Sequence, residues 1–108
     1  MKKDFFIIKI IDKIIFYYDE LKQKQINIYN YDNHKYMKII NFIFNYQVKH
    51  YYISNFIMNL YNILTDYKYR YNNNYDNFIY DLTICLTNIK NSKYNKYFIY
   101  NFYNILYN

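Results

Sequence analysis

One amphipathic stretch, residues 53–67, constrains the fold of this chain more than any other. Its apolar side chains recur at three- and four-residue steps, which is the spacing of one face of an α-helix. We therefore expect a helix here, with the rest of the chain forming helices that cover its apolar face. The apolar positions are Ile53, Phe56, Ile57, Leu60, Ile63, Leu64 and Tyr67, and Asn55, Asn59, Asn62 and Asp66 lie opposite.

Four other segments show the same period, and together they predict an all-α fold. We expect a small irregular bundle of four to five amphipathic helices, in one domain over residues 1–108, because this length suits a single core. The first helix spans residues 5–22 with Asp4 as its N-cap, although the high β propensity of Phe and Ile leaves a strand near its start as an alternative. A loop follows over residues 23–33, where the helical period is lost.

The later helices are separated by clusters of polar residues. The second covers residues 34 to about 49, and the period leaves open whether it ends near His50 or continues into residues 53–67. Three asparagines at 72–74 break the pattern, and Asp76 is the expected N-cap of the fourth helix. A fifth helix runs close to the C-terminus. The expected apolar stripe of the first helix is Ile7, Ile8, Ile11, Ile14, Ile15, Tyr18 and Leu21, and that of the second is Tyr36, Ile39, Ile40, Ile43, Phe44 and Gln47. The stripe of the fourth helix is Phe78, Ile79, Leu82, Cys85, Leu86 and Ile89, and that of the fifth is Tyr94, Tyr97, Phe98, Phe102, Ile105 and Leu106.

A short repeat links the third and fifth helices. FIMNLYNIL (56–64) and FIYNFYNIL (98–106) agree at seven of nine positions and lie 42 residues apart. The second and third helices can therefore mirror the fourth and fifth as two helical hairpins, with a period in the range of HEAT-like helix pairs. Two units are fewer than a solenoid usually needs, so we favour an irregular bundle. Coincidence within a narrow amino-acid alphabet is the other explanation.

The composition indicates an extremely AT-rich gene. Ile, Tyr, Asn, Lys and Phe fill 78 of 108 positions, and all five have codons whose first two bases are A or T. Gly, Pro, Ala and Trp, whose codons need G or C there, are absent. Codon usage alone therefore explains part of the abundance of lysine and tyrosine.

The positive charge is nevertheless uneven along the chain. The net charge is +6, and residues 22–62 carry five Lys and one Asp, a net +4. A helical row of lysines can contact successive phosphates, asparagines can donate to phosphates or base edges, and tyrosines can stack on unpaired bases. The candidate RNA-binding residues are Lys35, Lys38, Asn41, Asn45 and Lys49 on the second helix, with Tyr29 and Tyr31 in the loop before it. A solvated helix face and a tyrosine-rich loop are the alternative.

Several tyrosines fall outside the apolar stripes. Exposed tyrosine is enriched at protein interfaces because it supplies contact area with little loss of side-chain freedom. These residues predict surfaces that protein partners cover, and codon usage is again the alternative. They are Tyr51, Tyr52, Tyr69, Tyr71, Tyr100 and Tyr103.

Motifs for catalysis or metal binding are absent from the sequence. His34 and His50 are the only histidines, and they form no zinc-binding pattern with Cys85, the only cysteine. We expect no cofactor, no metal and no enzymatic activity, and we expect Cys85 to be a small buried hydrophobic residue. Charges interrupt the apolar N-terminal region, which argues against a signal peptide, and no apolar run is long enough for a membrane span.

These observations predict a small, basic, non-enzymatic helical subunit of a ribonucleoprotein inside the cell, for example of an organellar ribosome. Its lysines would contact RNA phosphates, and its tyrosine-rich faces would contact neighbouring proteins. The alternative is a helical protein–protein interaction or oligomerisation module that has no nucleic-acid role. The salt dependence of nucleic-acid binding distinguishes the two.

Overall fold

Helices account for the secondary structure of every part of the chain that the structure describes. The computed structural model describes residues 2–24, 33–49, 54–66, 74–91 and 95–108. These ranges contain α-helices and no strand, which confirms the all-α prediction and excludes a strand near the start of the first helix. The helices are α1 (Lys2–Gln23), α2 (Asn33–Lys49), α3 (Ser54–Thr65), α5 (Tyr75–Lys90) and α6 (Asn95–Tyr107).

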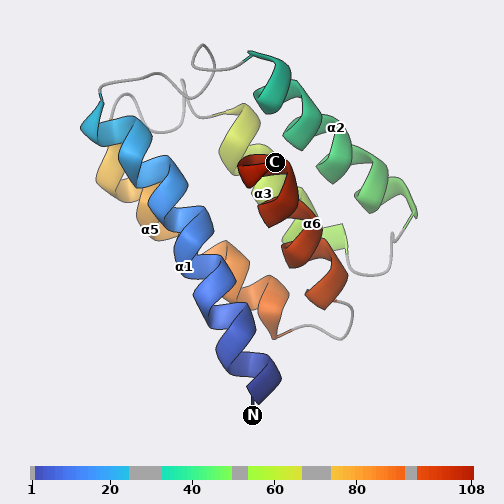
Figure 1. Ribbon diagram of the computed structural model, residues 1–108. Helices are drawn as coiled ribbons and strands as arrows, with labels where there is room; N and C mark the ends of the chain where they lie inside the picture. Colours follow the sequence, from blue (N-terminus) through green and yellow to red (C-terminus); the bar gives the residue numbers. More distant parts are fainter. Residues whose placement is uncertain (1, 25–32, 50–53, 67–73, 92–94) are drawn as a thin grey trace.

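The helices pack in two layers (Figure 1). In the front layer, α1, α6 and α2 lie side by side, and α5 and α3 lie behind them. Both α5 and α6 pack against three other helices: α5 against α1, α3 and α6, and α6 against α1, α2 and α5. The expectation that the rest of the bundle is organised around residues 53–67 is therefore wrong, because α3 packs mainly against α2 and α5, whereas α5 and α6 each pack against three helices.

The two-hairpin arrangement is present. α2 packs against α3, α5 packs against α6, and the two pairs meet through α2 with α6 and α3 with α5. α2 and α3 are separate helices, which settles the question that the period of residues 34–67 left open. The repeat places matching positions in the core: Ile57 and Ile99, Leu60 and Phe102, and Leu64 and Leu106 are all buried. The α1 helix then packs across the α5–α6 pair.

Most of the expected stripe positions that the structure describes are buried. The stripe of α5 lies within the core along its whole length, as predicted. In α6, however, Tyr97 is 79% exposed and Ile99, which the stripe omitted, is fully buried. Tyr100 and Tyr103 of α6 also pack against the core beside Ile99, so the buried arc of this helix is wider than the predicted stripe and centred further round the helix. Three other predicted stripe residues are also exposed, namely Ile8, Phe44 and Phe56.

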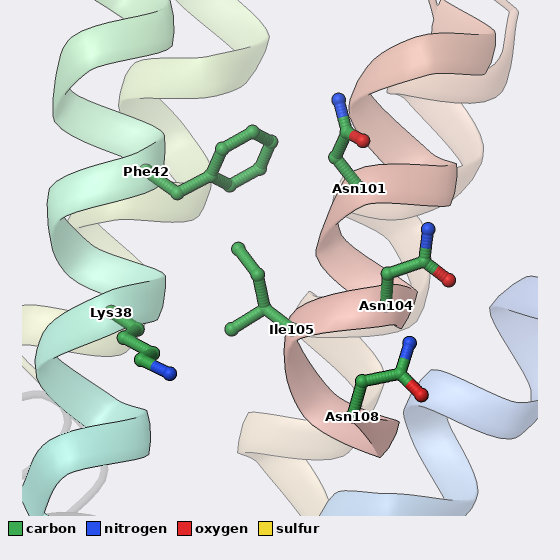
Figure 2. Close-up of a pocket in the computed structure, with 6 residues that line it drawn as sticks. All are labelled: Lys38, Phe42, Asn101, Asn104, Ile105 and Asn108. Atoms are coloured by element: carbon green, nitrogen blue, oxygen red, sulfur yellow. The ribbon is translucent and has the colours of Figure 1, made fainter.

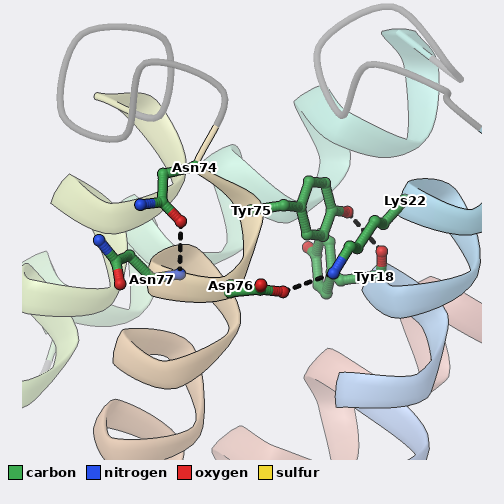
Figure 3. A network of polar contacts seen from close by, with 6 residues as sticks. All are labelled: Tyr18, Lys22, Asn74, Tyr75, Asp76 and Asn77. Atoms are coloured by element: carbon green, nitrogen blue, oxygen red, sulfur yellow. Dashed lines mark hydrogen bonds and ion pairs between the residues drawn. The ribbon is translucent and has the colours of Figure 1, made fainter.

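The N-terminus of α5 is anchored to the end of α1 (Figure 3). Asn74, rather than the expected Asp76, is the N-cap: its side-chain oxygen accepts a hydrogen bond from the backbone N–H of Asn77 at 3.3 Å. Asp76 instead lies in the first helical turn and forms an ion pair with Lys22 of α1. The N-cap expected at Asp4 is also wrong, because α1 already begins at Lys2.

Tyrosine hydroxyls bond to backbone carbonyls and so fasten one helix to another. Tyr75 of α5 donates to the carbonyl of Tyr18 in α1 (Figure 3), and Tyr107 of α6 donates to the carbonyl of Lys13 at 2.6 Å. The ring of Tyr18 also makes an edge contact with Phe78, 5.7 Å between centroids. Burial raises the pKa of Tyr18 well above the usual tyrosine value, because the phenolate would lose its hydration.

The tyrosines that fall outside the stripes are not all free surface. Tyr100 and Tyr103 are half-buried and pack against the core, so the expectation that they are exposed is wrong. The expected partner surface at Tyr51, Tyr52, Tyr69 and Tyr71 lies outside the described residues. Exposed aromatic area is found instead at Phe6, Phe16, Phe44, Tyr80 and Tyr97.

Candidate nucleic-acid interface

The predicted RNA-binding residues that the structure describes all lie on α2. Lys38, Asn41, Asn45 and Lys49 are exposed along this helix, whereas Lys35 is half-buried. Tyr29 and Tyr31 lie outside the described residues. The structure therefore presents four of the seven predicted groups on the outer side of one helix.

Lys35 joins three helices. Its ammonium donates a hydrogen bond to the carbonyl oxygen of Leu106 at 2.6 Å, in the last turn of α6, where carbonyls lack partners within the helix. The same nitrogen lies 5.6 Å from the ring centroid of Tyr17 in α1. A cation at a helix C-terminus is also favoured by the helix dipole. These contacts occupy Lys35 within the bundle, whereas Lys38 and Lys49 are exposed.

A groove runs between α2 and α6 beside Lys38 (Figure 2). Lys38 and Phe42 extend from α2 towards α6, and Ile105 extends from α6 towards the space between them. Asn101, Asn104 and Asn108 follow one another along the α6 side. The groove has a volume of about 430 Å³, within the range of small-ligand sites. Its chemistry combines carboxamides, one ammonium group and an apolar floor.

Aromatic packing supports the α2 side of this groove. The ring of Phe42 stacks on Phe98 of α6, with centroids 5.1 Å apart and planes inclined by 25°. Tyr46 contacts the same Phe98 edge-on at 5.0 Å. Phe98 is fully buried, so it holds Phe42 against the core while Phe42 itself stays half-buried. One part of the Phe42 ring therefore belongs to the core, and the rest borders the groove.

The three asparagines of α6 were missed at the level of sequence. They occur at three- and four-residue steps, so the signal for a polar face was present in FIYNFYNILYN. The expected stripe included Tyr97, which lies on this same exposed side, and so turned the apparent apolar face towards the asparagines. Their juxtaposition with Lys38 comes from the packing of α2 on α6, which no local spacing encodes.

The helices α2 and α6, which border the groove, contain no acidic residues. Neither helix contains an Asp or a Glu, whereas α2 carries Lys35, Lys38 and Lys49. The neighbouring α5 contains Asp76 and Asp81 and a single lysine.

Cys85 has the environment of a structural residue. Its side chain is buried, and Sγ lies 3.4 Å from the carbonyl oxygen of Phe56. Burial, with a smaller effect from the nearby Asp81, raises the pKa of the Cys85 thiol to about 12, and thiolate is the reactive form. Its expected role as a small buried hydrophobic residue is confirmed.

Other kinds of site find no support in the described ranges. His34 is exposed, and His50 lies outside those ranges. No three His, Cys, Asp or Glu residues come close enough to share a metal ion in the part of the chain that the structure describes. In the same part, every helix is too short or too polar to cross a bilayer.

Comparison with protein-family models, with curated proteins and with solved structures finds no match to this chain.

Proposed function

We propose that this protein is a small basic RNA-binding subunit of a ribonucleoprotein assembly, for example an organellar ribosome, and that it has no enzymatic role. The observation that carries the proposal is the meeting of a lysine with a row of amide groups where α2 packs against α6. There α2 and α6 lack acidic residues and border a groove with Lys38 and three asparagines. RNA offers what this side recognises: phosphates for lysine, and base edges and hydroxyls for carboxamides.

The binding of RNA to this face has a defined salt dependence. Each lysine–phosphate contact releases counterions, and for a single strand the slope of log affinity against log salt changes by about 0.7 per contact. Lys38→Gln with Lys49→Gln removes two exposed charges and leaves the structural Lys35 in place. Glutamine is a comparable helix former, so α2 remains folded.

The test is fluorescence anisotropy with a labelled single-stranded RNA over a range of salt concentrations. We expect the Lys38/Lys49 variant to lose affinity and to show a shallower salt slope. The matched control is Lys9→Gln with Lys24→Gln, which removes the same charge from exposed positions of α1 and the turn after it. Equal losses in the two variants, or no salt-dependent binding by the wild-type protein, would refute the proposal.

A protein-interaction module is the second candidate, and a separate observation favours it. Met37, Phe44 and Val48 are 50%, 52% and 66% exposed along the outer side of α2. Phe44 also contacts the half-buried ring of Tyr61 on α3, 6.3 Å between centroids, so this apolar surface continues from α2 onto α3. Exposed apolar patches mark interaction surfaces. If wild-type protein fails to bind RNA, this function takes first place.

A further inference from the structure

The two hairpins of the bundle correspond helix by helix as well as in sequence. Tyr75, the first residue of α5, lies 42 residues after Asn33, the first residue of α2, and the same offset separates Tyr107 from Thr65, where α6 and α3 end. This offset equals that of the repeat between FIMNLYNIL and FIYNFYNIL. Side chains at counterpart positions therefore occupy comparable places in the two hairpins.

The α1 helix covers the outer face of the second hairpin, which is the side away from α2 and α3. It packs against both α5 and α6. The ammonium of Lys13 in α1 lies 5.7 Å from the ring centroid of Tyr103, and the hydroxyl of Tyr107 donates to the carbonyl of Lys13. The order of the layers is therefore α1, then α5–α6, then α2–α3, with α6 between α1 and α2 in Figure 1.

The first hairpin exposes apolar side chains where the second hairpin buries them. In the part of the chain that the structure describes, α2 and α3 pack mainly against each other and against α5 and α6. Phe44 is 52% exposed, whereas its counterpart Leu86 is fully buried. Met37 is 50% exposed, whereas its counterpart Ile79 is half-buried and packs against the core. The outer face of α2–α3 is thus the counterpart of the face that α1 covers on α5–α6.

Tyr61 extends this apolar surface onto α3. Its counterpart is Tyr103, whose ring lies beneath Lys13 of α1, whereas Tyr61 contacts the exposed ring of Phe44. Beside it, the amide of Gln47 donates to Sδ of Met58 at 3.7 Å, and Met58 is 38% exposed. We define the α2–α3 face as Met37, Phe44, Val48, Met58 and Tyr61.

The surroundings of the α2–α3 face are nearly free of charge. The α3 helix contains no charged residue over its whole length. In α2, Lys35 bonds to α6 and Lys38 extends towards α6 (Figure 2). A charge of a partner buried against this face would lack an opposite charge, so the partner surface must also be apolar and uncharged. The α2–α3 face itself meets this requirement, and a two-fold axis brings the same patch of two copies together.

The area of the face is sufficient for a weak dimer. Its exposed fractions correspond to roughly 400 Å² of apolar surface, at about 200 Å² for a large side chain. Two copies would bury about twice this area, and because homodimer interfaces are about 65% apolar, the whole interface would bury about 1,200 Å². That value is the lower limit for specific interfaces, so the dimer should form only at high protein concentration.

We propose that two copies of this chain associate through their α2–α3 faces about a two-fold axis. Stacked helix pairs need a polar layer at each end, and α1 supplies it at one end of the single chain, with Lys9, Asp12, Lys13 and Glu20 in exposed positions. In the dimer an α1 helix lies at both ends of the stack. The association does not depend on RNA binding, because the groove lies between α2 and α6.

Sedimentation velocity without RNA, from micromolar to millimolar concentration, tests the dimer. The weight-average mass of the wild type should rise from that of one chain towards that of two. Added salt should preserve or increase this rise, because it screens the repulsion between chains of net charge +6 and does not weaken apolar contacts. Met37→Glu with Val48→Glu places like charges on both copies and should remain monomeric throughout. Glutamate is a good helix former, so the far-UV circular dichroism spectrum should match that of the wild type.

If the double variant loses helicity, Val48→Glu alone, at a position 66% exposed, serves instead and should raise the Kd of the dimer about tenfold or more. The matched control is Phe16→Glu with Tyr80→Glu, at positions of α1 and α5 that are 55% and 65% exposed, and it should dimerise as the wild type does. A wild type that is monomeric at millimolar concentration would overturn the inference. Equal dimerisation by the control and the Met37/Val48 variant would also overturn it. Either result would leave the RNA-binding proposal standing.

Discussion

Substitution of Leu60 by alanine tests which face of α3 is buried and, with it, the packing of the back layer. Leu60 is fully buried, between Ile57 and Leu64, which are each 1% exposed. Removal of its roughly three terminal carbons loses about 2.4 kcal/mol of transfer free energy, at about 0.8 kcal/mol per buried carbon. The residual cavity adds to this cost, so we expect a loss of about 2–5 kcal/mol in the free energy of unfolding. That is a large share of the ~5–15 kcal/mol typical of small domains.

Urea unfolding followed by far-UV circular dichroism measures this change through the shift in midpoint at constant slope. Asn59→Ala is the neighbouring control: Asn59 is exposed, and we expect a change within about 0.5 kcal/mol. Equal effects of the two substitutions, or a loss below about 1 kcal/mol for Leu60→Ala, would show that the buried face of α3 is wrongly placed.

Two further outcomes follow from burial. Phe98→Ala should destabilise the protein by about 3–5 kcal/mol and Tyr97→Ala by under about 0.5 kcal/mol, since Phe98 is fully buried and Tyr97 is 79% exposed; similar urea midpoints for both would contradict the assigned face of α6. Stability should fall as the pH rises above about 10, because the unfolded chain releases the Tyr18 proton while the folded state, with its raised pKa, retains it. Tyr18→Phe should flatten that alkaline decline in a pH series of thermal melts, and an unchanged decline would count against the burial of this phenol.

The buried face of a helix could be predicted from the sequence for some helices and not for others, for a physical reason. The stripe of α5 was predicted in full, because its buried residues follow a single helical period. The clearest stripe lies in α3, yet α3 packs mainly against α2 and α5 and is not a meeting point of three helices, so the clarity of a stripe does not show which helix is central. In α6 the buried arc is wider, and Tyr97 was counted with the apolar residues although it is exposed. Because tyrosine is both apolar and polar, its presence did not show which face of the helix is buried.

The candidate interface was predicted in part for a related reason. Exposure of Lys38 and Lys49 follows from the period of α2 alone. The hydrogen bond of Lys35 to the carbonyl of Leu106 in α6, and the position of Phe42 across one groove from Ile105, depend on how two helices distant in sequence pack together. Such contacts are tertiary, and neither spacing nor composition specifies them. The spacing of Asn101, Asn104 and Asn108 could be seen in the sequence, but the sequence did not show that α2 packs beside them.

Nuclear magnetic resonance titration of ¹⁵N-labelled protein with single-stranded RNA tests the central claim most directly, because it locates the bound strand on the protein. We expect the side-chain amide signals of Asn101, Asn104 and Asn108 to shift together with the backbone signals of Lys38 and Phe42. The exposed outer side of α1 should give unchanged signals in the same titration. Shifts centred on α1 or α5, or absence of shifts at RNA concentrations where anisotropy reports binding, would contradict the assignment of RNA binding to the α2–α6 groove.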